Sequence, residues 1–120
     1  MAEEKNFENR IKSFLKEQGC YFIKYWSGGS VTGKKFTRDG VPDILTCCMG
    51  RFLGIEVKAS NGKPSPLQIH NLKQIDEAGG FGILLYPEHW ELFKNFIYCL
   101  KAEDVNMYYN YDILKRRWSK

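Results

Sequence analysis

The sequence predicts an α/β fold in which helices cover both faces of a mixed four-stranded sheet, an α/β/α sandwich. Three observations predict it: helical spacing of apolar residues near the start, two apolar strands joined by a tight turn, and a helix followed by a last apolar strand. The expected elements are a helix over 4–18, strands over 21–26, 43–48 and 52–58, a helix over 66–78 and a strand over 81–86. Because one helical crossover joins the last two strands, they should run parallel.

Local signals justify the two helices. Apolar residues of the first recur at helical spacing: Phe7, Ile11, Phe14 and Leu15. Gly19 is typical of a residue that ends a helix. Ser65 is the expected N-cap of the second helix and Pro66 its first residue, since proline lacks an N–H and has a fixed φ. The residues expected on its buried face are Leu67, Leu72, Ile75 and Ala78, and Gly79-Gly80 should end it.

The chain after Pro87 predicts one more amphipathic helix that covers the sheet. Its apolar face comprises Leu92, Phe93, Phe96, Ile97 and Leu100. Residues 104–120 allow two interpretations: a final strand or helix with a solvated basic tail, or a set of rings that stack on nucleic-acid bases. The rings in question are Tyr108, Tyr109, Tyr111 and Trp118. We expect a single domain over 1–120, with its core over about 4–87 and a C-terminal helix and tail over 88–120.

The strand pair carries the most informative pattern. Met49-Gly50 is the expected turn, because glycine supplies the positive φ that tight hairpins require. The cross-strand pairs that follow are Cys48 with Arg51, Ile44 with Ile55, and Asp43 with Glu56. Opposed residues have Cβ atoms roughly 5 Å apart. The two carboxylates therefore become neighbours, and Lys58 points the same way as Glu56.

Two carboxylates at this distance repel each other unless a cation lies between them. Mg²⁺ suits such a site, because it takes few protein oxygens and completes its shell with water and phosphate. An ammonium beside the metal positions or activates a water, or stabilises charge on a phosphate. The alternative is a solvated ion pair. We favour a phosphodiester-hydrolysis site, since charges avoid apolar strands unless they are paired or bound to metal.

The run 40–43, the apolar hairpin and the run 56–58 resemble the Gly-x-Pro-Asp and Glu-x-Lys signature of the PD-(D/E)xK nuclease superfamily. Within it, the chain resembles the virus-type replication-repair nucleases (VRR-NUC) and the Holliday-junction-resolvase-like group, over about residues 4–87. The resemblance implies a restriction-endonuclease-like α/β/α sandwich with a central mixed four-stranded sheet.

The resemblance also implies roles for individual residues. Those implied to bind the metal are Asp43, Glu56 and the backbone carbonyl of Val57, with Lys58 orienting or activating water. Relatives carry a glutamate on the first helix; Glu8 matches the spacing in the resolvases and Glu4 that in the virus-type group. We favour Glu8 and keep Glu4 open. Gln68 matches a glutamine that helps hold the nucleophile or the scissile phosphate, the alternative being a solvent-facing side chain.

The loop before the acidic pair predicts contacts with DNA. It is rich in glycine and carries Lys34, Lys35 and Arg38 directly before the expected metal site, where a DNA backbone would have to pass. Resolvase-like enzymes bear a Gly/Ser-rich loop at the corresponding place, and Ser30 or Ser27 resembles its serine.

Composition agrees with a compact enzyme. A chain of 120 residues with 43% hydrophobic and 15% aromatic content is long enough for a real core and is not disordered. Its net charge of +4 favours a polyanionic partner. The four cysteines lack C-x-x-C spacing, so neither a zinc site nor a disulfide framework is expected. We expect no signal peptide and no membrane span, and hence a reducing cytoplasm.

Together these features predict a Mg²⁺-dependent DNA endonuclease, with Mn²⁺ as a substitute. The sharper hypothesis is a Holliday-junction resolvase of phage or mobile-element type acting on branched DNA, and stand-alone members of the resembled group act as homodimers. One alternative is a nuclease of the same fold that cuts linear or flapped DNA. Another is a non-catalytic nucleic-acid-binding module of a replication or repair assembly. The intact set of Asp43, Glu56 and Lys58 favours an enzyme, because binding alone does not need carboxylates that repel phosphate.

Overall fold

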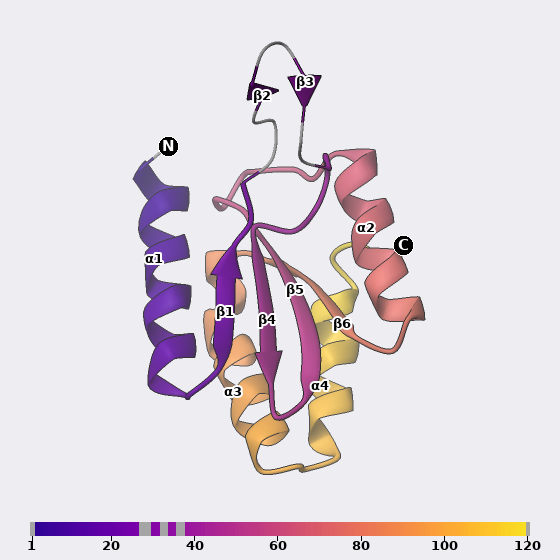
Figure 1. Cartoon of the computed structure of the whole chain (residues 1–120). Helices are drawn as coiled ribbons and strands as arrows, with labels where there is room; N and C mark the ends of the chain where they lie inside the picture. The colour runs from indigo at the N-terminus through magenta and orange to yellow at the C-terminus, as the bar shows by residue number, and fades with distance from the viewer. Residues whose placement is uncertain (1, 27–29, 32–33, 36–37, 120) are drawn as a thin grey trace.

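The computed structural model describes residues 2–26, 30–31, 34–35 and 38–119. Its elements in chain order are α1 (Ala2–Glu17), β1 (Tyr21–Lys24), β2 (Ser30–Val31), β3 (Lys34–Lys35), β4 (Ile44–Cys48), β5 (Arg51–Val57), α2 (Pro66–Glu77), β6 (Phe81–Leu85), the 3₁₀ turn η1 (Pro87–His89), α3 (Trp90–Lys101) and α4 (Asn106–Lys115) (Figure 1). No helix in these described ranges is long and apolar enough to cross a membrane.

Four strands form one mixed sheet in the order β1-β4-β5-β6, and β2 pairs with β3 in a separate ribbon. β1, β4 and β5 are antiparallel neighbours, while β6 runs parallel to β5 after the α2 crossover. Helices flank this sheet, so the predicted α/β fold is confirmed (Figure 1).

The β4–β5 hairpin has the predicted turn and register. Met49 and Gly50 both have positive φ, 52° and 76°, as a two-residue type I′ turn requires. The paired residues end with Ile44 opposite Ile55. β4 begins at Ile44 and not at Asp43 as expected, so Asp43 lies one residue before the last pair of the ladder. Its carboxylate is still a neighbour of Glu56, as predicted.

The two faces of the sheet have different cover. Leu53, Ile55 and Val57 of β5 belong to the main hydrophobic core, which they share with α1, α3 and α4. Because successive strand residues point to opposite faces, Glu56 faces the α2 side. Gly82 of β6 lets α2 approach closely, since a Cβ there would lie 2.5 Å from the Leu72 carbonyl oxygen.

Helix α2 begins at Pro66 as predicted and ends at Glu77, one residue earlier than expected, and its buried face differs. Ser65 caps it, and Gly79 follows with φ +96°. Leu72 is buried, whereas Leu67 and Ala78, which we expected inside, are exposed. The reason is that α2 packs mainly on β6, where Leu72 packs with Leu84, whereas Leu67 lies beside the turn at Gly40.

The C-terminal region is helical and part of the core. The Tyr111 hydroxyl accepts a hydrogen bond from the Gly82 N–H and donates one to Asp76. The indole N–H of Trp118 donates to the Gly82 carbonyl at 2.8 Å. These two rings are buried structural residues, so the base-stacking interpretation is wrong for them. Tyr108 and Tyr109 are exposed on α4.

Candidate active site

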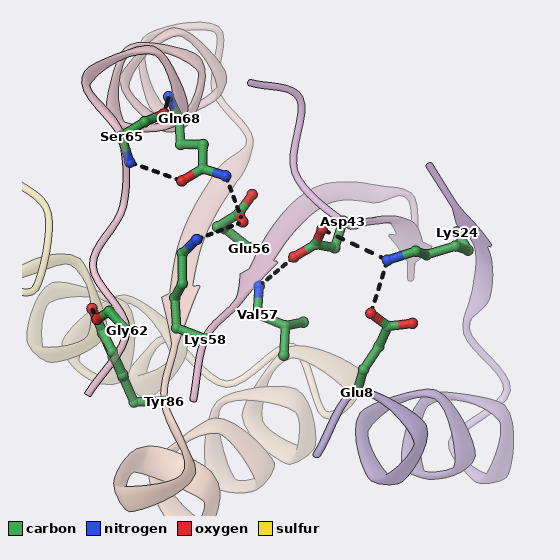
Figure 2. Close-up of polar contacts among 10 residues, drawn as sticks. All are labelled: Glu8, Lys24, Asp43, Glu56, Val57, Lys58, Gly62, Ser65, Gln68 and Tyr86. Atoms are coloured by element: carbon green, nitrogen blue, oxygen red, sulfur yellow. Dashed lines mark hydrogen bonds and ion pairs between the residues drawn. The ribbon is translucent and has the colours of Figure 1, made fainter. Parts of the chain in front are cut away.

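Asp43 and Glu56 meet at one end of the sheet. Oδ2 of Asp43 accepts a 2.8 Å hydrogen bond from the Val57 N–H. Glu56, on β5, is only 2% exposed. Its Oε2 accepts a 3.0 Å hydrogen bond from Nε2 of Gln68 and lies 3.5 Å from Nζ of Lys58 (Figure 2). The structure thus brings the residues of the Asp and Glu-x-Lys motif and the α2 glutamine into one cluster.

The environment of Glu56 disfavours its charged form. Burial, and after it the negative charge of Asp43, raise the pKa of Glu56 to about 8, while the Lys58 ammonium acts in the opposite direction. Without a cation, Glu56 therefore holds a proton at neutral pH. A metal ion that takes the place of this proton would remove the repulsion between the two acids.

The residues present fit a hard divalent cation. Within the described residues, Oε1 of Glu56 is buried and has no hydrogen-bond partner, so it has a lone pair to offer. The carboxylate of Asp43 beside it offers further oxygens. Mg²⁺ binds few protein oxygens beside water and phosphate. Across the same described ranges, no three His, Cys, Asp or Glu side chains gather into one metal-binding group. The acidic donors are thus a pair.

A lysine separates this pair from the acid of the first helix. Nζ of Lys24 lies 2.8 Å from Oε1 of Glu8 and 3.6 Å from Oδ1 of Asp43 (Figure 2). Lys12 also contacts Glu8, at 3.2 Å. Burial raises the pKa of Glu8, but the hydrogen bonds from Lys24 and Lys12 outweigh it, and the net pKa is lowered. Burial likewise disfavours charged Lys24, yet Glu8 and Asp43 raise its pKa overall.

Lys24 is the site residue that the sequence analysis missed. It ends β1 opposite Ile44, which places it next to Asp43. A lysine at the end of a short apolar strand was the available signal. That signal can be interpreted only when β1 is known to pair with β4. No short turn joins these two strands, so local sequence does not predict their pairing.

Gln68 holds two parts of the structure at once. The side-chain Oε1 of Gln68 accepts a 2.9 Å hydrogen bond from the backbone N–H of Ser65. The backbone N–H of Gln68 donates a 3.2 Å hydrogen bond to Oγ of Ser65. This capping box fixes the start of α2. Nε2 of the same side-chain amide donates a hydrogen bond to Glu56, so the residue that caps the helix also orients this carboxylate.

The other predicted residues lie on α1, in the β2–β3 ribbon and in the segment before β4. Glu4 is half-exposed on α1, whereas Glu8 is 4% exposed. Arg38 is exposed, and its guanidinium donates to Oδ1 of Asn71 at 3.4 Å. The backbones of Ser30, Lys34 and Lys35 form the β2–β3 ribbon. Their side chains, and the whole of Ser27, lie outside the described part of the structure.

The fold and the site define a protein of the restriction-endonuclease-like class. Its features are a mixed sheet with flanking helices, two acids at adjacent strands, and a lysine two residues beyond the second acid. The family model described as archaeal Holliday junction resolvase (Hjc) matches residues 2–79. The chain belongs to this family, and through it to the PD-(D/E)xK nuclease superfamily. The resemblance to the virus-type group stays a prediction. A comparison with curated proteins gave no significant match.

The raised pKa of Glu56 predicts how stability depends on pH. Its folded-state pKa of about 8 exceeds the ordinary value of 4.5. Between these values the folded state binds a proton that the unfolded state has released, so the free energy of unfolding falls as the pH rises. We expect urea unfolding in EDTA to show a loss on the order of 1–4 kcal/mol from about pH 5 to pH 8.

Glu56→Gln should remove most of this slope, because the amide keeps the shape of the carboxyl group and does not ionise. Glu8 does not interfere, since its lowered pKa places its titration below this range. Glu77→Gln, an exposed change on α2, is the control and should keep the slope. An unaltered slope in Glu56→Gln would contradict this explanation.

Proposed function

We propose that this chain is a metal-dependent DNA endonuclease that cuts four-way junctions, with Mg²⁺ as its cation and Mn²⁺ as a substitute. The observation that carries the proposal is the buried Glu56 beside Asp43, with Lys58 at 3.5 Å, in a member of the Holliday junction resolvase family. Membership in that family supports a nuclease acting on branched DNA. The phage or mobile-element type stays a prediction.

Asp43, Glu56 and the backbone carbonyl of Val57 would hold the cation. When bound, the cation supplies positive charge to the scissile phosphate and lowers the pKa of a coordinated water. Glu56 would bind the cation as a carboxylate, so its proton would be released when the cation is held. The Val57 N–H keeps Asp43 in place, and the amide of Gln68 keeps Glu56 in place.

Lys58 would act on the water or on the phosphate. Its ammonium lies beside Glu56. From there it would donate a hydrogen bond to the attacking water, to orient it, or to a phosphate oxygen, to stabilise its charge. A hydrogen bond holds the loop that follows Lys58, since the Tyr86 hydroxyl donates to the Gly62 carbonyl at 2.8 Å (Figure 2). This hydrogen bond supports a fixed position for the lysine.

Glu8 completes the acidic cluster in this proposal, directly or through a metal-bound water. Its burial and its link to Asp43 through Lys24 favour it over the half-exposed Glu4. Lys24 holds both acids in position and balances their charge in the absence of metal.

DNA would approach from the end of the sheet where the acids lie. Figure 1 shows β2 and β3 beyond this end. We assign Ser30, Lys34, Lys35 and Arg38 to contacts with the phosphate backbone. A four-way junction has two-fold symmetry, so a homodimer of this single domain would present two sites to two strands.

Cleavage of DNA tests the proposal directly. Purified protein should cut four-way DNA faster than flapped, nicked or linear DNA, and only with Mg²⁺ or Mn²⁺ present. Asp43→Asn should lower the rate on the order of 10²-fold or more, because it weakens cation binding. Asp112→Asn, an exposed change on α4, is the control. Cutting in EDTA would reject the mechanism, and a preference for linear duplex would reject the junction assignment alone.

Lys58→Ala separates chemistry from binding. The variant should bind four-way DNA as well as the parent in a gel-shift assay in EDTA, yet cut on the order of 10²-fold more slowly with Mg²⁺. Lys63→Ala, which removes an exposed lysine from the following loop, should leave the rate nearly unchanged. Equal turnover in Lys58→Ala and the parent would exclude this lysine from the reaction.

The cleavage assay also decides whether Glu8 or Glu4 is the α1 acid that takes part in the reaction. Glu8→Gln should slow cleavage on the order of tenfold or more, whereas Glu4→Gln should not. Circular dichroism checks that both variants fold. Slow cleavage by Glu4→Gln alone would transfer the role to Glu4.

A further inference from the structure

Trp26 is a large aromatic ring left open to solvent near the acids. It follows β1 and is 69% exposed, whereas Trp118 is buried and Trp90 packs among the phenylalanines of α1 and α3. An indole has a large apolar surface, and leaving it in water forgoes the free energy of burying it. An exposed ring at a functional site therefore suggests a ligand that covers it.

The ring lies one side chain away from the acids. Nζ of Lys24 is 5.2 Å from its centroid, and the same ammonium contacts Glu8 and Asp43. Nζ of Lys5 is 6.0 Å from the ring and 3.9 Å from Oε2 of Glu8. Both ammonium groups thus lie over the largely exposed indole, and an aromatic ring with cations close to it suits a base and its phosphate.

Tyr25, the residue before the ring, makes one contact through its backbone and one through its side chain. The Tyr25 N–H donates to the Asp43 carbonyl at 2.8 Å. The Tyr25 hydroxyl accepts a 2.8 Å hydrogen bond from the Arg38 N–H. Because Tyr25 directly precedes Trp26, the backbone hydrogen bond to Asp43 holds the chain one residue before the ring close to the acids. Binding a ligand on a ring attached to fixed backbone costs less conformational entropy than ordering a free loop.

We propose that Trp26 is a stacking platform for a nucleobase whose face is open, at the branch point of the DNA. This inference rests on the proposed function, which it deepens. In an intact duplex both faces of each base pair are covered by neighbours, whereas strands that part or exchange leave a face uncovered. Stacking on the indole would favour branched over linear DNA and place the nearby phosphate beside Asp43 and Glu56.

The test compares Trp26→Ala and Trp26→Phe with the parent. Binding of a four-way junction and of linear duplex is measured in EDTA, where the DNA stays uncut. Trp26→Ala should bind the junction about tenfold more weakly and the duplex unchanged, since stacking on one base carries an effect of that size. Trp26→Phe should keep most of the affinity, because it keeps an aromatic face. Tyr109→Ala, which removes an exposed ring from α4, should bind as the parent does.

Fluorescence gives a second, independent signal. The exposed indole should lose emission when the junction binds, and the loss should be absent in Trp26→Phe. Equal binding by Trp26→Ala and the parent, or an equal loss on junction and duplex, would overturn the platform.

Cleavage by the parent with Mg²⁺, assayed in parallel, separates the two proposals. If the parent cleaves DNA and Trp26→Ala keeps the junction preference, the stacking proposal is rejected and the nuclease proposal stands. If the junction preference depends on Trp26 but the parent cleaves no DNA, the nuclease proposal is rejected and the stacking proposal stands.

Discussion

Glu56 is a carboxylic acid buried in an apolar strand beside a second acid, and the rest of the site is arranged around it. Removing a carboxylate from water is costly unless a proton, a hydrogen bond or a cation compensates. Gln68 and Lys58 satisfy one oxygen of Glu56, and the other is buried without a hydrogen-bond partner in the described residues. A proton or a divalent cation meets this demand, and this is the physical link between the fold and a metal-dependent reaction.

The lysines of the site neutralise the acids unequally: Glu8 has more positive charge beside it than Glu56 has. Lys12 and Lys24 neutralise Glu8, and Lys24 also reaches Asp43, so that the helix acid is stable as an anion. Among the described residues, the cation in contact with Glu56 is Lys58, and it does not offset the burial of Glu56 and the charge of Asp43. The demand for a further cation is therefore concentrated on the β5 side of the cluster, where the chain carries its Glu-x-Lys motif.

Local sequence signals predicted the parts of the fold that local chemistry determines. The Met49-Gly50 turn fixed the hairpin register, and Ser65 with Pro66 fixed the start of α2. Signals that depend on distant partners were missed. Lys24 enters the site through the β1–β4 pairing, and the partner of Tyr111 and Trp118 is the backbone of Gly82, which no nearby residue indicates. The exposure of Leu67 likewise follows from how much of the sheet α2 covers.

Diffraction from crystals soaked in Mn²⁺ tests the central claim most directly, because the anomalous signal locates the ion itself. We predict a single strong peak bordered by the carboxylates of Asp43 and Glu56, with Lys58 beside it, and no peak at this place in crystals of Asp43→Asn. An empty site between these carboxylates at saturating Mn²⁺, or an ion bound only elsewhere, would contradict the account.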